Sequence, residues 1–313
     1  MLFGLTIVVV LLVVTQPVIS GGDYRPALAS SDNLKKQVYH LSDTIGQQSS
    51  LVDRLDVSAE YIFAQLSQYN NNVSFQDFDV QGELYRNVVV EIDGKKQCGT
   101  YVIGAHYDTY GSLPGVDDNS SGVAGLIELN RLFSKNKPLC DVQLVAFTLE
   151  EPPYFRTKNM GSYVHAKSLM DKKIGVKLMI SLEMIGYFND AAGSQDYPVA
   201  GMQYLYSQTG NFISLVGDLS QISEIRFIKQ QMRKATDLPV YSINAPAAVV
   251  GIDFSDHLNY WHFDYPAIMV SDTAFNRNKN YHSENDTAEK LDYLRMAKVV
   301  DGVYYSLLAH MNQ

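Results

Sequence analysis

The sequence predicts a three-layer α/β domain with a mixed central sheet. Short apolar runs typical of strands alternate along the chain with segments of helical periodicity. The composition, with 46% hydrophobic and 19% charged residues, is that of a globular chain that can bury a large core. The length of 313 residues fits a signal segment followed by one large domain, which we expect over residues 21–313.

The N-terminal residues predict export. Residues 1–20 carry no charge, and the apolar run from Leu5 to Val14 has the length of the hydrophobic part of a signal peptide. A membrane-spanning helix needs about 20 apolar residues, whereas Gln16 and Pro17 end this run. We therefore expect a signal peptide over residues 1–20, cut after Ser20, and a periplasmic or extracellular protein. No Lys or Arg precedes the run, so an uncleaved N-terminal segment is the alternative, and the only expected membrane attachment.

The domain is expected to open with a helix and an antiparallel pair of strands. Residues 51–69 are amphipathic, and from Val73 the period of apolar residues changes from helical to alternating. Residues 84–92 and 97–106 have strand character, and Asp93-Gly94 between them is the dipeptide most typical of a tight hairpin turn. We expect these two strands to pair directly.

The rest of the domain is expected to alternate helices and strands, which predicts crossover units and parallel strand pairs. Helical segments are expected at 122–133, 160–170, about 215–235 and 287–309, and strands at 142–149, 177–182 and 266–270. Residues 189–250, rich in Gly, Ser, Gln and Ala, are the least regular and predict an irregular rim or lid.

Charge and cysteine content restrict the function further. A net charge of -9 and a pI near 5.2 exclude a nucleic acid partner, because there is no basic surface to replace its counterions. Cys98 and Cys140, the only cysteines, each open an apolar run. If the two runs are neighbours, export would oxidise them to a disulfide that contributes on the order of 4 kcal/mol. Two buried free thiols are the alternative.

Residues that bind metals follow the predicted strands. In an open α/β sheet, ligands bind at the carboxyl ends of the strands. Each such residue alone is ordinary, but together they predict a site for zinc, and a shared carboxylate would hold two ions about 3.5 to 4 Å apart. The residues are His106, Asp117, Asp118, Glu150, Glu151, Glu183 and His282.

The motifs around these residues resemble a known family. The strings GAHYDTY, GVDDNSSGVAGLIEL, FTLEEPPY, SLEMIGYF, DFSDHLNYW and NYHSENDTAEKLDY are similar to those of exported bacterial aminopeptidases with two co-catalytic zinc ions, relatives of glutamate carboxypeptidase II and glutaminyl cyclase. The resemblance extends from about His40 to Ala309. It implies the zinc exopeptidase fold, an α/β/α domain with a largely parallel central sheet of about eight strands.

The resemblance also implies which residues bind each zinc ion. One zinc would be held by His106, Asp117 and Glu183, and the other by Asp117, Glu151 and His282. It further implies a cis peptide bond between Asp117 and Asp118. Many members have Asp where this chain has Glu183, which is one methylene longer.

Other residues receive supporting roles by the same comparison. Glu150 would act as the general base, taking a proton from a water that bridges the two zinc ions. Asp108 would orient a zinc-bound imidazole, and Asp256 is expected beside the site, with a purely structural role as its alternative. Arg156 is a candidate for binding a substrate carboxylate. Some relatives have a tyrosine that helps to stabilise the oxyanion where this chain has Ile252.

These expectations describe a zinc aminopeptidase acting on peptides with a free N-terminus. A glutaminyl cyclase with one zinc ion is the alternative enzyme. A non-catalytic binding domain is a third reading, disfavoured because no ligand is missing. The number of bound zinc ions, two, one or none, separates the three.

Overall fold

A computed structural model describes residues 13–18, 24–45 and 52–313. The expected cut after Ser20 lies outside these residues, as does most of the expected signal peptide. Within the described part of the chain, no helix is both long and apolar enough to cross a membrane.

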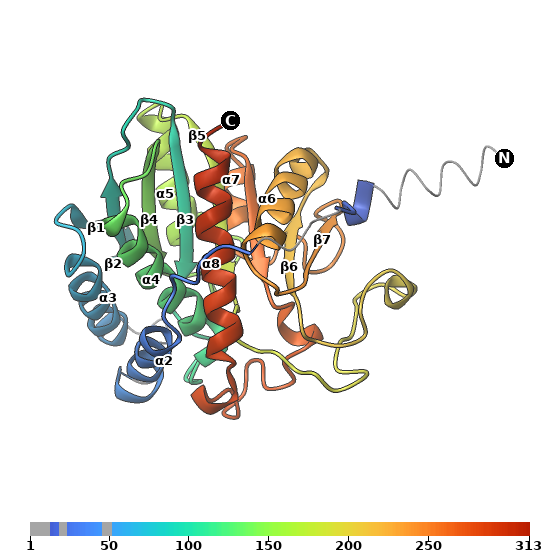
Figure 1. Cartoon of the computed structure of the whole chain (residues 1–313). Helices are drawn as coiled ribbons and strands as arrows, with labels where there is room; N and C mark the ends of the chain where they lie inside the picture. Colours follow the sequence, from blue (N-terminus) through green and yellow to red (C-terminus); the bar gives the residue numbers. More distant parts are fainter. Residues whose placement is uncertain (1–12, 19–23, 46–51) are drawn as a thin grey trace.

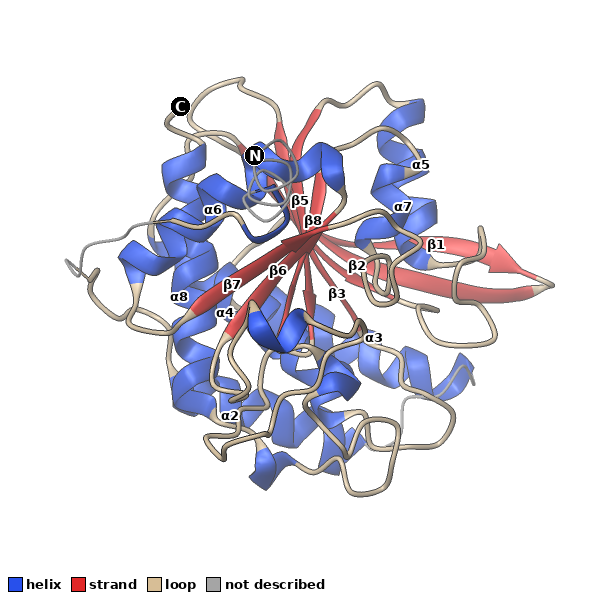
Figure 2. Ribbon diagram, turned by 90° about the vertical axis from the view of Figure 1, so that its right-hand side faces the viewer, coloured by secondary structure: helices blue, strands red, loops and turns tan. Residues whose placement is uncertain are grey.

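An eight-stranded mixed sheet forms the middle layer, with helices on both faces (Figures 1 and 2). The strands are β1 (Val73–Val80), β2 (Glu83–Ile92), β3 (Thr100–His106), β4 (Asp141–Phe147), β5 (Val176–Glu183), β6 (Ile213–Gly217), β7 (Val240–Asn244) and β8 (Ala267–Ser271). Their order is β1-β2-β4-β3-β5-β8-β6-β7. Strands β4, β3, β5 and β8 run parallel to one another, while the pairs β1–β2, β2–β4 and β8–β6 are antiparallel. The predicted fold class is confirmed.

Two groups of helices cover the sheet. The helices are α2 (Ser31–Tyr39), α3 (Val52–Ser67), α4 (Gly122–Lys135), α5 (Gly161–Asp171), α6 (Ile222–Ala235), α7 (His257–Trp261) and α8 (Tyr293–His310). Helices α2, α3, α4, α6 and α8 pack together on one face, and α5 with α7 on the other. Alternate strand residues enter different cores: Val88 and Val90 face the larger one, and Val89 faces the smaller. Burial on both faces explains the continuous apolar character of the central strands.

The expected hairpin at Asp93-Gly94 is wrong. Strand β4 lies between β2 and β3 and pairs with both. Gly94 is instead where the chain crosses the start of β4: its N–H donates to Asp141 Oδ1 at 2.7 Å, and a Cβ there would lie 2.4 Å from the carbonyl carbon of Cys140. The observed hairpin joins β1 to β2 through Gln81 and Gly82, which both have positive φ.

Strands β6 and β7 were not predicted. Residues 213–217, partly within the expected helix 215–235, form β6, and α6 begins only at Ile222. Strand β7 lies inside the segment expected to be an irregular rim. Both strands have five residues, which is too short for hydrophobic periodicity to separate a strand from a helix. The irregular parts of that segment lie before β6 and after β7.

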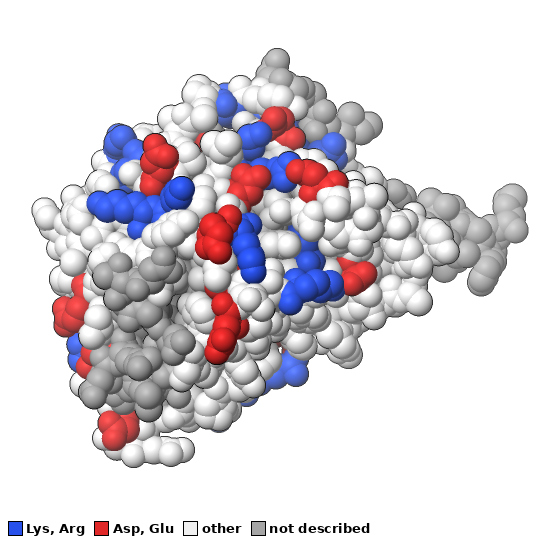
Figure 3. All heavy atoms as spheres, turned by 90° about the horizontal axis from the view of Figure 1, so that it is seen from below, with Lys and Arg blue, Asp and Glu red and all other residues white. Residues whose placement is uncertain are grey.

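The disulfide expected between Cys98 and Cys140 is present, with the two Cα atoms 5.2 Å apart. It connects the segment before β3 to the residue before β4. On the face seen in Figure 3, acidic and basic side chains are interspersed, so this face presents no broad basic field.

Candidate metal centre

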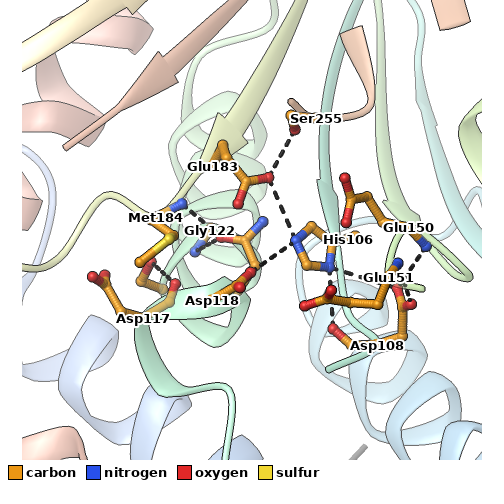
Figure 4. A network of polar contacts seen from close by, with 12 residues as sticks. His106, Asp108, Asp117, Asp118, Gly122, Glu150, Glu151, Glu183, Met184 and Ser255 are labelled. Atoms are coloured by element: carbon orange, nitrogen blue, oxygen red, sulfur yellow. Dashed lines mark hydrogen bonds and ion pairs between the residues drawn. The ribbon is translucent and has the colours of Figure 1, made fainter. Parts of the chain in front are cut away.

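The carboxyl ends of the parallel strands bring the predicted ligand types together (Figure 4). His106 is the last residue of β3, and Glu183 is the last residue of β5. Glu150 and Glu151 follow β4, and the long loop after β8 returns His282 to the same edge. Two groups with metal-ligand geometry result, each with its ligand atoms within 4.8 Å of one another: His106, Asp118 and Glu183, and Asp118, Glu151 and His282.

Asp118 belongs to both groups. Its Oδ1 lies 3.2 Å from Nε2 of His106, and its Oδ2 lies 2.9 Å from Nε2 of His282. Nε2 of His106 is also 3.4 Å from Oε2 of Glu183, and Nε2 of His282 is 3.2 Å from Oε1 of Glu151. One carboxylate therefore faces two imidazoles, each of which also faces a glutamate.

The expectation that Asp117 holds this shared position does not agree with the geometry. The Asp117 carboxylate accepts hydrogen bonds from the Gly186 N–H at 3.1 Å and from Nδ2 of Asn278 at 3.0 Å, and it belongs to neither ligand group. In Figure 4 it lies apart from His106. The cis peptide bond likewise lies one residue later than expected, between Asp118 and Asn119. The motif GVDDNSSG offers two adjacent aspartates, and their sequence spacing does not distinguish them.

Neighbouring polar groups fix the ligands. Nδ1 of His106 lies 3.1 Å from the carbonyl oxygen of Asp108 and 3.5 Å from its carboxylate. The same carboxylate accepts the backbone N–H groups of Glu150 and Glu151 at 3.1 and 3.0 Å. Asp108 thus connects the end of β3 to the glutamates after β4, so its expected position beside His106 agrees with the structure.

Two other residues support the first group. The Ser255 hydroxyl donates to Oε2 of Glu183 at 2.7 Å. Asp256 is completely buried and close enough to His106, Glu183 and Asp108 to interact with all three electrostatically. Its position agrees with the expected place beside the site, and Ser255 in the same string was not predicted.

The electrostatics of the cluster call for cations. Burial raises the pKa of Glu151 to about 8, and burial together with nearby carboxylates raises that of Glu150 well above its usual range. Burial works against charge on Asp118 as well, but His106 and His282 lower its pKa below the usual value. Buried acids packed this closely share protons or bind positive ions.

Two buried atoms test whether a metal fits. Nε2 of His106 and Oδ1 of Asp118 are both buried and lie 3.2 Å apart, yet neither atom makes a hydrogen bond of good geometry. Buried polar atoms are rarely left unsatisfied in proteins. Imidazole nitrogens and carboxylate oxygens are common ligands of zinc in proteins, so the residues fit zinc.

Aromatic rings hold His282 from both sides. Its ring stacks on Tyr281, with centroids 3.7 Å apart, and on Tyr110, at 4.1 Å. Burial and the carboxylates of Asp118 and Glu151 raise the pKa of Tyr281, so its hydroxyl stays protonated. Sequence reasoning missed both tyrosines, because in a chain with 21 tyrosines only adjacency to His282 distinguished Tyr281.

An apolar cavity of about 110 Å³ opens beside the first ligand group, with Glu183 and Tyr281 in its wall. Most of its lining is apolar or aromatic, and includes Tyr206, Phe212, Tyr241, Ile252, Phe254 and Met269. Among the described residues, the one charged group in the lining besides Glu183 is Asp196, which is exposed and paired with Lys279 at 2.7 Å. Ile252 packs against Val216 and Met269. Its side chain therefore forms part of the apolar wall of the cavity.

Arg156 is already paired, next to a residue that lines the cavity. Its guanidinium bonds to Asp253 and lies over the rings of Phe155 and Phe254, 5.3 and 5.2 Å from their centroids. Phe254 lines the cavity. In the structure Arg156 therefore joins two loops, and its expected contact with a substrate carboxylate would compete with Asp253.

Known proteins share the sequence pattern and the fold of this chain. Residues 87–307 match the model of peptidase family M28. The chain is 47% identical over 297 residues to the uncharacterized protein YfbL of Escherichia coli K12, covering 92% of this chain and 91% of that protein. In fold it is similar to the zinc aminopeptidase BSAP of Bacillus subtilis (TM-score 0.71, 12% identity, 91% of this chain and 96% of that one). It is also similar to the glutaminyl cyclase of Porphyromonas gingivalis (TM-score 0.68, 17% identity, 91% of this chain and all of that one). The chain belongs to peptidase family M28.

Proposed function

We propose that this protein is a zinc aminopeptidase that removes the first residue of peptides with a free amino group. The observation that carries the proposal is the pair of ligand groups sharing Asp118. His106, Asp118 and Glu183 would hold one zinc ion, and Asp118, Glu151 and His282 the other. When bound, such ions lower the pKa of a water molecule toward about 7 and polarise a carbonyl group.

Glu150 is proposed as the general base. It lies beside Glu151 at the end of β4 but belongs to neither ligand group. Its carboxylate would accept a proton from the attacking water and return it to the nitrogen of the leaving amine as the C–N bond breaks.

Two further groups would act on the substrate. The Tyr281 hydroxyl, beside His282, is proposed as the hydrogen-bond donor to the developing oxyanion. Ile252 has no hydroxyl group with which to donate such a bond. The buried carboxylates would attract the positive charge of a free α-amino group. The apolar cavity would receive the side chain of the first residue, and its lining favours a large uncharged one.

The glutaminyl cyclase reading is kept as an alternative because a solved member of that class shares the fold over its whole length. A cyclase would use one zinc ion, whereas the two ligand groups here support two. The disulfide supports an exported location, periplasmic or extracellular, where thiols are oxidised.

Zinc content and substrate choice test the proposal together. The protein loaded with zinc and then dialysed is assayed on aminoacyl amides, their N-acetylated forms and a peptide with N-terminal Gln. We expect about two zinc ions per chain and hydrolysis of free-amine substrates with large apolar first residues. One zinc ion and cyclisation of the Gln peptide would establish the cyclase reading instead.

A further inference from the structure

Residues 13–18 lie against helix α6 and strand β7 (Figure 1). Strand β7 is the last strand of the sheet order. The contact is organised by Lys229 of α6, whose side chain is only 3% exposed. Its Nζ donates to the carbonyl oxygens of Thr15 and Gln16 at 2.7 and 3.0 Å, and to Oγ of Ser242 at 3.1 Å. A lysine ammonium has three N–H groups, so each of them has an acceptor.

Other groups hold the same segment. Oγ of Ser242 donates to the Thr15 carbonyl at 3.0 Å, and Nη1 of Arg233 donates to the Val18 carbonyl at 3.1 Å. The side chain of Gln16 is 1% exposed, so it is packed into the domain. Further along, the N–H of Arg25 donates to the carbonyl oxygen of Ala235, the last residue of α6, at 3.0 Å.

The segment supplies most of the hydrogen-bond acceptors of the Lys229 ammonium. Burial lowers the pKa of Lys229 to about 8, because it removes the hydration that stabilises the charged form. Hydrogen bonds to the ammonium replace part of that hydration. Two of its three acceptors are backbone carbonyls of residues 15 and 16. In a protein without these residues, water would have to replace the two carbonyl groups as hydrogen-bond acceptors beside the Ser242 hydroxyl.

We propose that residues 13–18 are a permanent part of the folded protein, bound in this site on α6 and β7. The chain is then not cut after Ser20, and the apolar residues 5–14 stay attached to the domain. This is the alternative to the signal peptide expected from the sequence. The inference rests on contacts remote from the metal centre, so it does not depend on the proposed peptidase activity.

The segment also supports one wall of the cavity. The Ser242 carbonyl accepts a hydrogen bond from the Tyr206 hydroxyl at 2.9 Å. The Ser242 hydroxyl donates a hydrogen bond to the Thr15 carbonyl. Tyr206 and Tyr241, the residue before Ser242, both line the cavity. The binding of residues 13–18 therefore supports the strand that forms one wall of this cavity.

The first test determines the N-terminus. The full chain is produced in a bacterial host with a working export pathway, and the recovered protein is digested and analysed by mass spectrometry. We expect peptides that contain residues 13–18 joined to residues 19–25. A homogeneous N-terminus at Gly21 would overturn the proposal.

The second test measures whether the segment is bound. The native cysteines are joined in a disulfide, so a single thiol introduced by Gln16→Cys, at a buried site, or by Pro17→Cys, at an exposed one, can be labelled selectively with a maleimide. We expect position 16 to react at least tenfold more slowly than position 17. Lys229→Met should bring the two rates within about twofold, whereas Arg226→Met, at an exposed site of the same helix, should leave the difference intact.

A milder variant covers the case in which Lys229→Met does not fold. Ser242→Ala removes the hydroxyl that bonds both Lys229 and Thr15, and it should raise the rate at position 16 with the fold retained. Equal labelling at positions 16 and 17 in the otherwise unchanged protein would show that the segment is not bound, and would overturn the proposal.

Discussion

Replacing the two adjacent aspartates separately would show which one holds the metals. Asp118 presents one oxygen to His106 and the other to His282, at 3.2 and 2.9 Å, so Asp118→Asn removes a charged donor from both ligand groups. Loss of a partner that only orients a ligand weakens metal binding by about 10- to 100-fold. Loss of a shared ligand should exceed this, which corresponds to more than about 2.7 kcal/mol at each ion.

Asp117→Asn is the matched control. Its oxygens bond to the Gly186 N–H and to Asn278, away from the histidines. The oxygen of the asparagine amide can accept one of these two hydrogen bonds. Its NH₂ group would then face the other N–H donor, so that one hydrogen bond is lost. We expect about 1–3 kcal/mol of lost stability from the unsatisfied group, with zinc affinity changed less than tenfold.

Both variants are dialysed against buffers of graded free zinc, their zinc content is measured by atomic spectroscopy, and their unfolding is followed with denaturant. The reasoning predicts that Asp118→Asn loses zinc at both positions and that Asp117→Asn retains it. It would be refuted if Asp117→Asn lost both ions while Asp118→Asn kept them.

Three further predictions concern catalysis and stability. Glu150→Gln should keep the fold and the zinc but lower kcat by several orders of magnitude; full activity with full zinc would exclude Glu150 as the base. Tyr281→Phe should lower kcat by about 10²–10³-fold with little change in KM, and an unchanged kcat would assign the oxyanion to another donor. Burial lowers the pKa of His165 to about 3, so below pH 6.5 the unfolded chain binds a proton that the folded chain does not, and stability should fall by about 1.4 kcal/mol per pH unit from this residue. His165→Asn should remove that part of the slope in denaturant unfolding measured between pH 6.5 and 4, and an unchanged slope would contradict the assignment.

The site residues at the ends of the central strands were predictable, because a His or Glu follows one apolar run after another. His106, Glu151 and Glu183 each follow a buried apolar run, and the rule that parallel strands deliver ligands to one edge places them together. The choice between Asp117 and Asp118 was not predictable in this way. It depends on backbone dihedral angles in a short turn, where one residue of offset sends a side chain to the opposite side.

Local signals failed where tertiary contacts decide the outcome. The Asp93-Gly94 dipeptide predicted a hairpin, but the glycine is needed for close passage over Cys140, and the strand between β2 and β3 comes from 47 residues further along the chain. Helical periodicity places Asp301 on the solvent side of the C-terminal helix, but it is buried and accepts hydrogen bonds from the backbone N–H groups of Leu28 and Ala29, far away in the sequence. No periodicity in the sequence carries such contacts.

The most direct test of the central claim compares substrates with a free and an acetylated α-amino group, using the zinc-loaded protein. Acetylation removes both the positive charge and the lone pair of the amine, so the buried acids and the metals lose their contact with it. The account predicts that kcat/KM falls at least about a hundredfold on acetylation, as in other sites built around a required polar group. Cleavage of acetylated peptides at interior bonds, at rates equal to those of the free-amine substrates, would contradict the aminopeptidase assignment.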